Sequence, residues 1–197
     1  MIKEEKTNDF EKIRQLRAKR DNIIKQLEEL EKKIESKFYD TKLSEQIMRK
    51  KRTLFELEKT IKIYSSNPDY TNGFIDLYNI SESNSFYLVC FHEEKKPIGE
   101  LGCSDSIFAN NISYCIYKEY RNKGLGFQSV CLLLEYLNSK GIENITIFVE
   151  KNNIPSLRIA EKLKDIYKSY TLSNYDTTIA FHFCINNKKL ESNTKSK

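Results

Sequence analysis

The first 67 residues contain no glycine and no proline, and this absence constrains the fold more than any other feature of the chain. The first proline is Pro68 and the first glycine is Gly73. Because these two residue types are the strongest helix breakers, the sequence ahead of Pro68 is free to form long helices. We therefore expect a helical hairpin or coiled coil over residues 1–66, a second domain over 67–186 and a disordered polar tail over 187–197.

Apolar residues recur at spacings of three and four in two series within this first part, as in a heptad seam. Their members are Ile13, Leu16, Ile23, Leu27, Leu30 and Ile34, then Leu43, Ile47, Leu54, Leu57, Ile61 and Tyr64. Arg20 and Lys50 fill one polar slot in each series, and Asp40 or Thr41 could cap the second helix. The pattern predicts an antiparallel helical hairpin or two coiled-coil helices. Since so narrow a stripe is marginal alone, we expect it to pack on a protein partner, a second copy in a homodimer, or the second domain.

The net charge of +5 resides in this helical part, where residues 1–62 hold 18 Lys/Arg against 13 Asp/Glu. A basic arm could bind nucleic acid, an acidic protein or an anionic membrane. Both signs are interspersed, however, which is typical of solvated helix faces. Even the basic run 49–52 is better read in that way, so nucleic acid is not an expected partner.

Cysteine usage and hydropathy indicate a cytoplasmic protein without a metal. The five cysteines lack the close pairing of a zinc site, and their number is odd. They lie in apolar runs where a free thiol acts as a small hydrophobe, which favours a reducing compartment. The polar N-terminus predicts no signal peptide, and no apolar run is long enough to span a membrane.

The second part alternates strand-like and helix-like runs. Strands are expected over 74–80, 85–91, 97–102, 111–117, 144–149, 166–172 and 177–185, and helices over 127–139 and 153–164. Antiparallel strands come first, and strand–helix–strand–helix–strand follows. This order predicts an α/β (α+β) fold with a mixed, mainly antiparallel sheet flanked by helices.

The segment most informative about chemistry is Arg121-x-x-Gly124-x-Gly126, which follows a strand and opens a helix. Glycines let the backbone approach a ligand, and the first N–H groups of a helix point outward unpaired. Together with the basic residue they suit an anion such as a pyrophosphate. By itself a two-glycine turn is also typical of a tight connection. No Gly-Lys-Ser/Thr follows, so this is not a Walker loop, nor is it a full dinucleotide fingerprint.

This segment resembles motif A of the GNAT (GCN5-related N-acetyltransferase) superfamily. The stretch from Asn153 through Ser156 to Lys162 resembles the second motif of the same superfamily, in the version found among ribosomal-protein N-terminal acetyltransferases. The resemblance extends over about residues 97–170, and the two motifs are separated by one helix and one strand, as in that family.

The resemblance implies an acetyl-CoA cosubstrate and a primary-amine acceptor that attacks the thioester directly. The acceptor would be a protein N-terminus or lysine, or a small amine such as an aminosugar. The resemblance assigns the cosubstrate to three groups of residues. Backbone groups of Tyr114, Cys115 and Ile116 would bind the pantetheine arm, and Asn153 and Ser156 would lie near the thioester. The pyrophosphate would be held by the N–H groups of Arg121, Asn122, Lys123, Gly124, Leu125 and Gly126.

The sequence departs from the family pattern where catalysis is concerned. Ala160 stands where a tyrosine often acts as general acid, and Asn111 where an acidic residue is common. Glu100 remains as a candidate base, and Ser156 or Tyr167 as a candidate acid. These departures favour one alternative, a non-catalytic acyl-CoA-binding module with a coiled-coil assembly arm. A basic coiled-coil protein that binds nucleic acid through the run 49–52 is a second alternative.

The family also inserts two helices between its first two strands. The strands that end at Ile80 and begin at Ser85 are too close together for such an insertion. We therefore expect these helices to be absent, or the N-terminal hairpin to supply them.

Overall fold

The computed structural model describes residues 2–35, 40–81, 85–104, 110–174 and 176–188. The chain divides into two compact units, residues 1–67 and residues 68–197.

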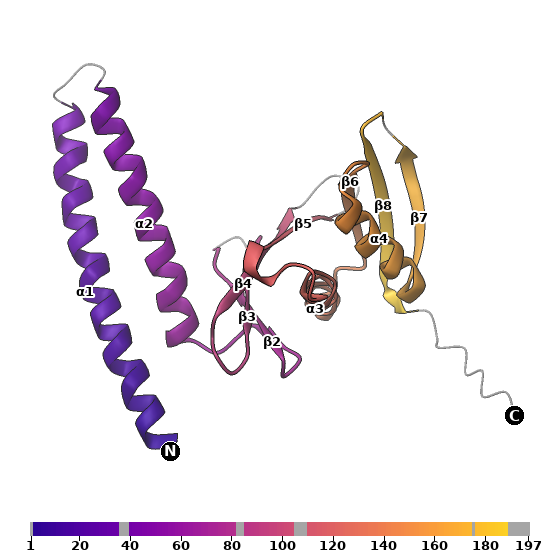
Figure 1. Cartoon of the computed structure of the whole chain (residues 1–197), viewed down its shortest axis with the longest axis horizontal. Coiled ribbons are helices and arrows are strands. Elements are labelled where there is room, and N and C mark those ends of the chain that lie inside the picture. The colour runs from indigo at the N-terminus through magenta and orange to yellow at the C-terminus, as the bar shows by residue number, and fades with distance from the viewer. Residues whose placement is uncertain (1, 36–39, 82–84, 105–109, 175, 189–197) are drawn as a thin grey trace, which may run out of the picture. The chain divides into compact units, whose positions relative to one another are not determined.

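The first unit is an antiparallel pair of helices, α1 (Ile2–Glu35) and α2 (Thr41–Ser65), which run side by side in Figure 1. Asp40 is the N-cap of α2, because its side chain accepts a hydrogen bond of 3.0 Å from the Leu43 N–H. The predicted cap is therefore confirmed at Asp40. The rest of the expected connection, residues 36–39, lies outside the described residues.

The predicted seam is the contact between these helices. Five residues form its buried centre, namely Ile23, Leu27, Leu43, Ile47 and Leu57. Leu16, Leu30, Ile34 and Leu54 pack around them, half-buried. The polar slot at Lys50 is satisfied across the pair, since its Nζ donates to Gln26 Oε1 at 2.6 Å. The hairpin alternative is thus the one the structure adopts.

The second unit is built on one sheet of eight strands in the order β1-β2-β3-β4-β5-β6-β8-β7. The strands are β1 (Tyr70–Thr71), β2 (Ile75–Asn79), β3 (Phe86–Phe91), β4 (Pro97–Ser104), β5 (Asn110–Ile116), β6 (Asn144–Glu150), β7 (Tyr167–Asn174) and β8 (Thr178–Lys188). Every neighbouring pair is antiparallel except β5 and β6, which are parallel. The expected mixed, mainly antiparallel sheet is confirmed.

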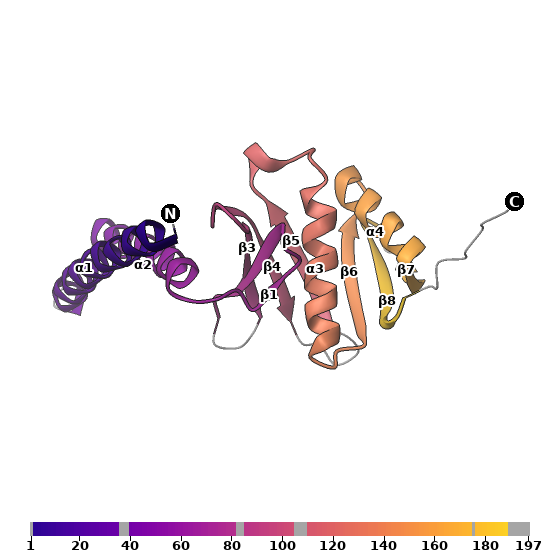
Figure 2. The ribbon, with the colours of Figure 1, turned by 90° about the horizontal axis from the view of Figure 1, so that it is seen from below.

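Helices α3 (Leu125–Ser139) and α4 (Ile154–Ile166) lie beside the sheet, α3 in front of β5 and β6, and α4 along β6 and β8 (Figure 2). Each follows a parallel strand, so the chain leaves the end of β5 for α3, returns through β6, and leaves again for α4. The core cluster of 26 buried residues is formed by the inward faces of the strands and of both helices.

Several element boundaries differ from the expectation. The first helix of this unit begins at Leu125 rather than residue 127, because Gly124 takes a left-handed conformation as its N-cap. A short 3-10 turn, Lys118–Tyr120, and the two-residue strand β1 were not predicted. The last strand continues through the expected start of the tail to Lys188, since the first residue of β7, Tyr167, pairs with Lys188. Residues 189–197 of the expected tail lie outside the described residues.

Strands β2 and β3 pair directly, with Ile75 opposite Phe91 and Asn79 opposite Tyr87. Two helices do not fit into the few residues that join them, so the family-typical insertion is absent from this place. Within the described part of the chain, none of the helices has the length and hydropathy to cross a membrane.

Candidate functional site

The sheet opens between β5 and β6. These strands are paired only at their beginnings, Asn110 with Ile145 and Asn111 with Thr146. Beyond these residues the two strands have no ladder between them. Helices α3 and α4 both start at this open end, because each follows the carboxyl end of one of the two strands. Two helix N-termini and one unpaired strand edge therefore meet at a single place, a common location for ligand sites in sheets with parallel strands.

The direction of the backbone groups along β5 follows from its pairing with β4. The Tyr117 N–H donates to the Ile98 carbonyl at 2.9 Å, and Cys115 pairs with Glu100. Since the N–H and C=O groups of a strand alternate between its two sides, Cys115 turns its backbone groups to β4. Tyr114 and Ile116 turn theirs to the open edge. The sequence named all three residues, but only these two direct backbone groups at the opening.

A side chain braces this open edge. The Arg121 Nε donates to the Ile116 carbonyl oxygen at 2.8 Å. The guanidinium therefore ties the turn after β5 to the last residue of the strand. Arg121 was expected to contribute its backbone N–H, and this role of its side chain was not predicted. The Ile116 N–H and both backbone groups of Tyr114 face the opening without being used by this contact.

The segment 121–126 has the backbone geometry of an anion site. Asn122 and Gly124 have positive φ angles, 61° and 77°. Left-handed residues that alternate with right-handed ones turn successive N–H groups toward one concave face. The first helical hydrogen bond of α3 runs from the Gln128 N–H to the Gly124 carbonyl at 3.3 Å. The N–H groups of the first three helical residues consequently have no acceptor within the helix.

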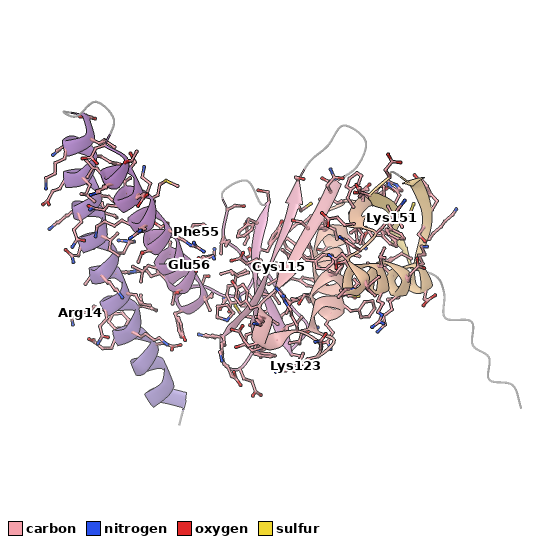
Figure 3. All side chains as sticks on the ribbon, turned by 45° about the horizontal axis from the view of Figure 1, so that its top comes forward. Arg14, Phe55, Glu56, Cys115, Lys123 and Lys151 are labelled. Atoms are coloured by element: carbon pink, nitrogen blue, oxygen red, sulfur yellow. The ribbon has the colours of Figure 1, made fainter. Side chains whose placement is uncertain are left out.

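The surroundings of this segment suit a phosphate. A Cβ added at Gly124 would meet only the Gln128 amide, at 3.9 Å, so the space in front of the loop is open. The loop carries Arg121 and Lys123 and no acidic residue. Figure 3 labels Lys123 in the loop and Cys115 on the neighbouring strand. The positive charges of these two side chains therefore strengthen the attraction that the unpaired N–H groups have for an anion.

Gly126 has a different role from Gly124. A Cβ at this position would lie 3.1 Å from the Ile159 Cδ1 and 3.6 Å from the Ile116 Cγ1. The first turn of α3 thus packs tightly against both α4 and the end of β5. This close packing holds the three parts of the site together, and it gives a steric reason for the second glycine of the motif.

The first turn of α4 forms the other wall. Asn153 is its N-cap and accepts a hydrogen bond of 3.2 Å from the Ser156 N–H. The side-chain oxygen of Asn153, Oδ1, is therefore used within the helix turn, while its side-chain nitrogen, Nδ2, can still donate to a ligand. The Ser156 side chain lies beside the hydroxyl of Tyr114. Burial raises the pKa of Tyr114, and the interaction with Ser156 acts in the opposite direction.

Glu100 occupies the other face of the sheet. As a direct cross-strand neighbour of Cys115, it shares a face with that exposed side chain, whereas Tyr114 points to the helix side. The Tyr117 hydroxyl donates to Glu100 Oε1 at 3.0 Å. Sequence reasoning identified Glu100 and missed Tyr117. Strand alternation from Cys115 to Tyr117 was the available signal.

Tyr167 is not brought to the loop. It is 2% exposed, and its pKa is raised first by burial and then by Cys131, Glu135 and Tyr70. Glu135 follows the first residue of α3 by ten positions, which corresponds to about 15 Å along a helix. The phenol therefore lies among residues of the middle and later turns of α3, well away from the loop.

The two histidines of this unit have structural partners. His92 Nδ1 lies 2.8 Å from the carboxylate of the buried Asp76. His182 Nδ1 lies 3.2 Å from the Thr146 hydroxyl, and its ring centre lies 4.6 Å from that of Tyr170, with the two planes tilted by 40°. Among the described residues no group of three or more His, Cys, Asp or Glu side chains could hold a metal ion.

Comparison with known families gives a match to the model "Acetyltransferase (GNAT) domain" over residues 36–164. The match covers more than half of the chain. It begins ahead of α2, further toward the N-terminus than the motif resemblance, and it ends before β7 and β8.

Solved structures with a similar outline include an acetyltransferase of the GNAT family from Bacillus anthracis, with 16% identity over 55% of this chain and 71% of that one, at a TM-score of 0.45. The ribosomal-protein-S5-alanine acetyltransferase of Vibrio fischeri has 18% identity, with coverages of 53% and 63% and a TM-score of 0.42. A putative acetyltransferase from Salmonella typhimurium, solved with its cofactor acetyl-CoA, has 13% identity, coverages of 52% and 66% and a TM-score of 0.41. At these TM-scores the similarity is limited to the general arrangement of helices and strands.

Proposed function

Because this chain belongs to the GNAT acetyltransferase family, we propose that it transfers an acetyl group from acetyl-CoA to a primary amine. The acceptor would be a protein N-terminus or lysine, or a small amine such as an aminosugar. The observation that carries the proposal is the meeting of three features at one opening. These are the loop 121–126 with its unpaired N–H groups, the free edge of β5, and the first turn of α4.

The residues at this opening fit the expected cosubstrate. The loop N–H groups and the side chains of Arg121 and Lys123 offer donors and positive charge for a pyrophosphate. The backbone groups of Tyr114 and the Ile116 N–H are placed to pair with the amides of a pantetheine arm, as another strand would pair with them. Asn153 and Ser156, in the first turn of α4, are the proposed contacts for the thioester end of the arm.

The reaction has no need of a covalent enzyme intermediate. Acetyl-CoA supplies a thioester whose carbonyl is open to attack by a neutral amine. An amine is mostly protonated at neutral pH, so the chain must accept a proton. Glu100 is the proposed acceptor, directly or through water, and the Tyr117 hydroxyl fixes one of its oxygens. An outward N–H of β5 is the proposed donor to the tetrahedral oxyanion.

The first test is a thermal melt of the full chain with excess acetyl-CoA, and with ATP and NAD as controls. A ligand that binds only the folded state raises the melting temperature, by an amount that grows with its ratio to Kd. We expect a selective shift with acetyl-CoA. A cooperative melt with no shift, or equal shifts with ATP, would exclude a functional acetyl-CoA site.

A second test separates an enzyme from a non-catalytic acyl-CoA module. Release of free coenzyme A is followed with three acceptors: a peptide with a free N-terminus, the N-acetylated peptide with one lysine, and an aminosugar. An acetyltransferase releases coenzyme A faster with one of them than with buffer alone. Tight binding of acetyl-CoA without amine-dependent release across a wide set of amines would favour the module.

A further inference from the structure

The Tyr114 hydroxyl is a buried polar group without a conventional partner. Among the described residues, three buried side-chain polar atoms have no hydrogen-bond partner: the hydroxyls of Tyr114, Tyr120 and Ser129. A buried unpaired hydroxyl costs free energy, so its presence in a folded protein calls for an explanation. Of the three, only Tyr114 lies on the strand that borders the opening between β5 and β6.

The Tyr114 hydroxyl lies on the side of the opening where the proposed function expects the thioester. Its backbone faces the open edge, while its side chain reaches the first turn of α4, where Ser156 lies beside the hydroxyl. Ala160 follows Ser156 by one helical turn on the same face of α4 and is fully buried. Because an alanine side chain has no polar atom, this face of α4 offers the Tyr114 hydroxyl no hydrogen-bond partner at position 160.

The hydroxyl is also in the state that a donor requires. Burial raises the pKa of Tyr114 above its ordinary value, so the phenol is protonated at neutral pH. Its O–H has no acceptor of good geometry in the protein. A sulfur atom that gains negative charge in front of it would be such an acceptor.

We propose that Tyr114 is the proton donor to the coenzyme A sulfur, with Ser156 as the side chain that positions its hydroxyl. This inference rests on the proposed function. In the step, the amine nitrogen forms a bond to the thioester carbonyl carbon, and the carbon–sulfur bond breaks with its electron pair on sulfur. The Tyr114 O–H proton moves to that sulfur. The nitrogen loses its proton to Glu100, which passes it to solvent, and a solvent proton restores the phenol, so the protein is unchanged after one turnover.

The arrangement across the sheet supports this assignment. Glu100 and Tyr117 lie on one face of β5, and Tyr114 lies on the other, next to α4. An amine that approaches the carbonyl from the Glu100 face would leave the sulfur on the helix face. The base and the acid would then act on opposite sides of the reacting carbon without competing for one another's proton.

The test compares two ligands that differ only at sulfur, coenzyme A and desulfo-coenzyme A, by calorimetry. In the full chain, the affinity for coenzyme A relative to its desulfo analogue should increase between about pH 7 and 9, because the thiolate accepts a stronger hydrogen bond than the thiol. In Tyr114→Phe we expect coenzyme A to bind roughly tenfold more weakly at the upper pH, as for the loss of a hydrogen bond to a charged group. Binding of desulfo-coenzyme A should stay unchanged.

Tyr136→Phe is the matched control, because it also removes a buried phenol, but near the far end of α3. It should leave the preference for coenzyme A over the desulfo analogue and its pH dependence intact. Ser156→Ala should weaken the preference partly, since the hydroxyl of Tyr114 remains. An unchanged preference in Tyr114→Phe, with both ligands bound, overturns the assignment of Tyr114 alone. Failure of the unmodified chain to bind either ligand overturns the proposed function itself.

Discussion

The two units of this protein differ in how their sequences determine their structures. The hairpin of residues 1–67 has a buried centre of five residues, all on the two helical seams. The unit of residues 68–197 has a core cluster of 26 buried residues drawn from strands and helices throughout its length. The hairpin thus depends on a local repeat, and the sheet unit on contacts between distant segments.

This difference explains why the candidate site lies in the sheet unit. The candidate site needs a strand edge, a loop and a second helix start to converge, and only long-range contacts fix such a geometry. A seam of regularly spaced apolar residues holds two helices together but creates no cavity for a ligand. The hairpin also presents mixed charges outside its seam, which favour solubility over a specific small-molecule site.

The largest difference is expected when one leucine is shortened in each core. Leu133→Ala, at a fully buried position of α3, should lower the free energy of unfolding by about 2–5 kcal/mol, because the surrounding sheet and helices collapse only partly around the cavity. Leu27→Ala, at the 6% exposed seam, should cost roughly 1–2 kcal/mol, since solvent and seam side chains fill the gap more easily.

Hydrogen exchange measured by mass spectrometry reports the two units separately. Leu133→Ala should increase exchange across β5, β6 and α3, and Leu27→Ala only in the hairpin. Equal losses of protection in both units from either substitution would mean that the chain unfolds as one cooperative body, and the contrast between the units would then disappear.

The sequence predicted the hairpin and most of its seam, although Ile13, Ile61 and Tyr64 of the predicted series are not in the seam cluster. The seam positions and the Asp40 cap were read from spacing and side-chain chemistry alone, which are local signals. It also predicted the strand–helix order of the second unit and the glycine loop, because each of these begins or ends at a marked change of pattern. The family expectation that these motifs raised is confirmed by the match over residues 36–164.

What the sequence did not predict depends on pairing between segments. The direction of the Cys115 backbone groups follows from the register with β4, and the location of Tyr167 from its proximity to Cys131 and Glu135 of α3. The contact of Tyr117 with Glu100 and that of Arg121 with Ile116 likewise require the strand ends to be placed in space. None of these has a local signature, so spacing alone could not assign them.

The next largest effect is expected from Gly124→Glu in the loop. The substitution places a carboxylate and its side chain in the open space where a pyrophosphate would lie, and we expect on the order of 100-fold weaker binding of acetyl-CoA. Gly141→Glu is a close control. Its φ of 83° is similar to the 77° of Gly124, and a Cβ there meets nothing within 4 Å, but Gly141 follows the far end of α3. Both variants should therefore lose similar stability, and calorimetry should show lost binding only in the first. Equal binding of acetyl-CoA by both variants would show that the loop is not part of the acetyl-CoA site.

A smaller effect is expected on the pH dependence of stability. It should again distinguish the units, because both histidines lie in the sheet unit. Burial lowers the pKa of His182, which is 6% exposed beside Thr146. A histidine with a lowered pKa stabilises the fold fully above its unfolded value of about 6.5 and progressively less as the pH falls below it. His182→Gln should lack this component, so the gap in melting temperature between parent and variant should narrow from pH 8 to pH 5.5. A constant gap would mean that His182 titrates equally in both states. Exchange in the hairpin should not differ between parent and variant at either pH.

The smallest effect is expected from removing the hairpin. Every residue assigned to the loop, the β5 edge and the first turn of α4 lies between Tyr114 and Ser156, within a unit that has its own core. A chain that begins at residue 66 should therefore bind acetyl-CoA within about twofold of the parent affinity, a difference of less than about 0.5 kcal/mol. Oligomeric state and acceptor preference are the properties expected to change, because the hairpin exposes apolar side chains outside its seam, Phe10, Met48 and Phe55, that a partner could cover. Calorimetry on the truncated chain, together with light scattering on both forms, measures these two outcomes independently. A soluble, folded truncation that no longer binds acetyl-CoA would show that the site depends on the hairpin, and the separation of a locally determined arm from a catalytic sheet unit would have to be abandoned.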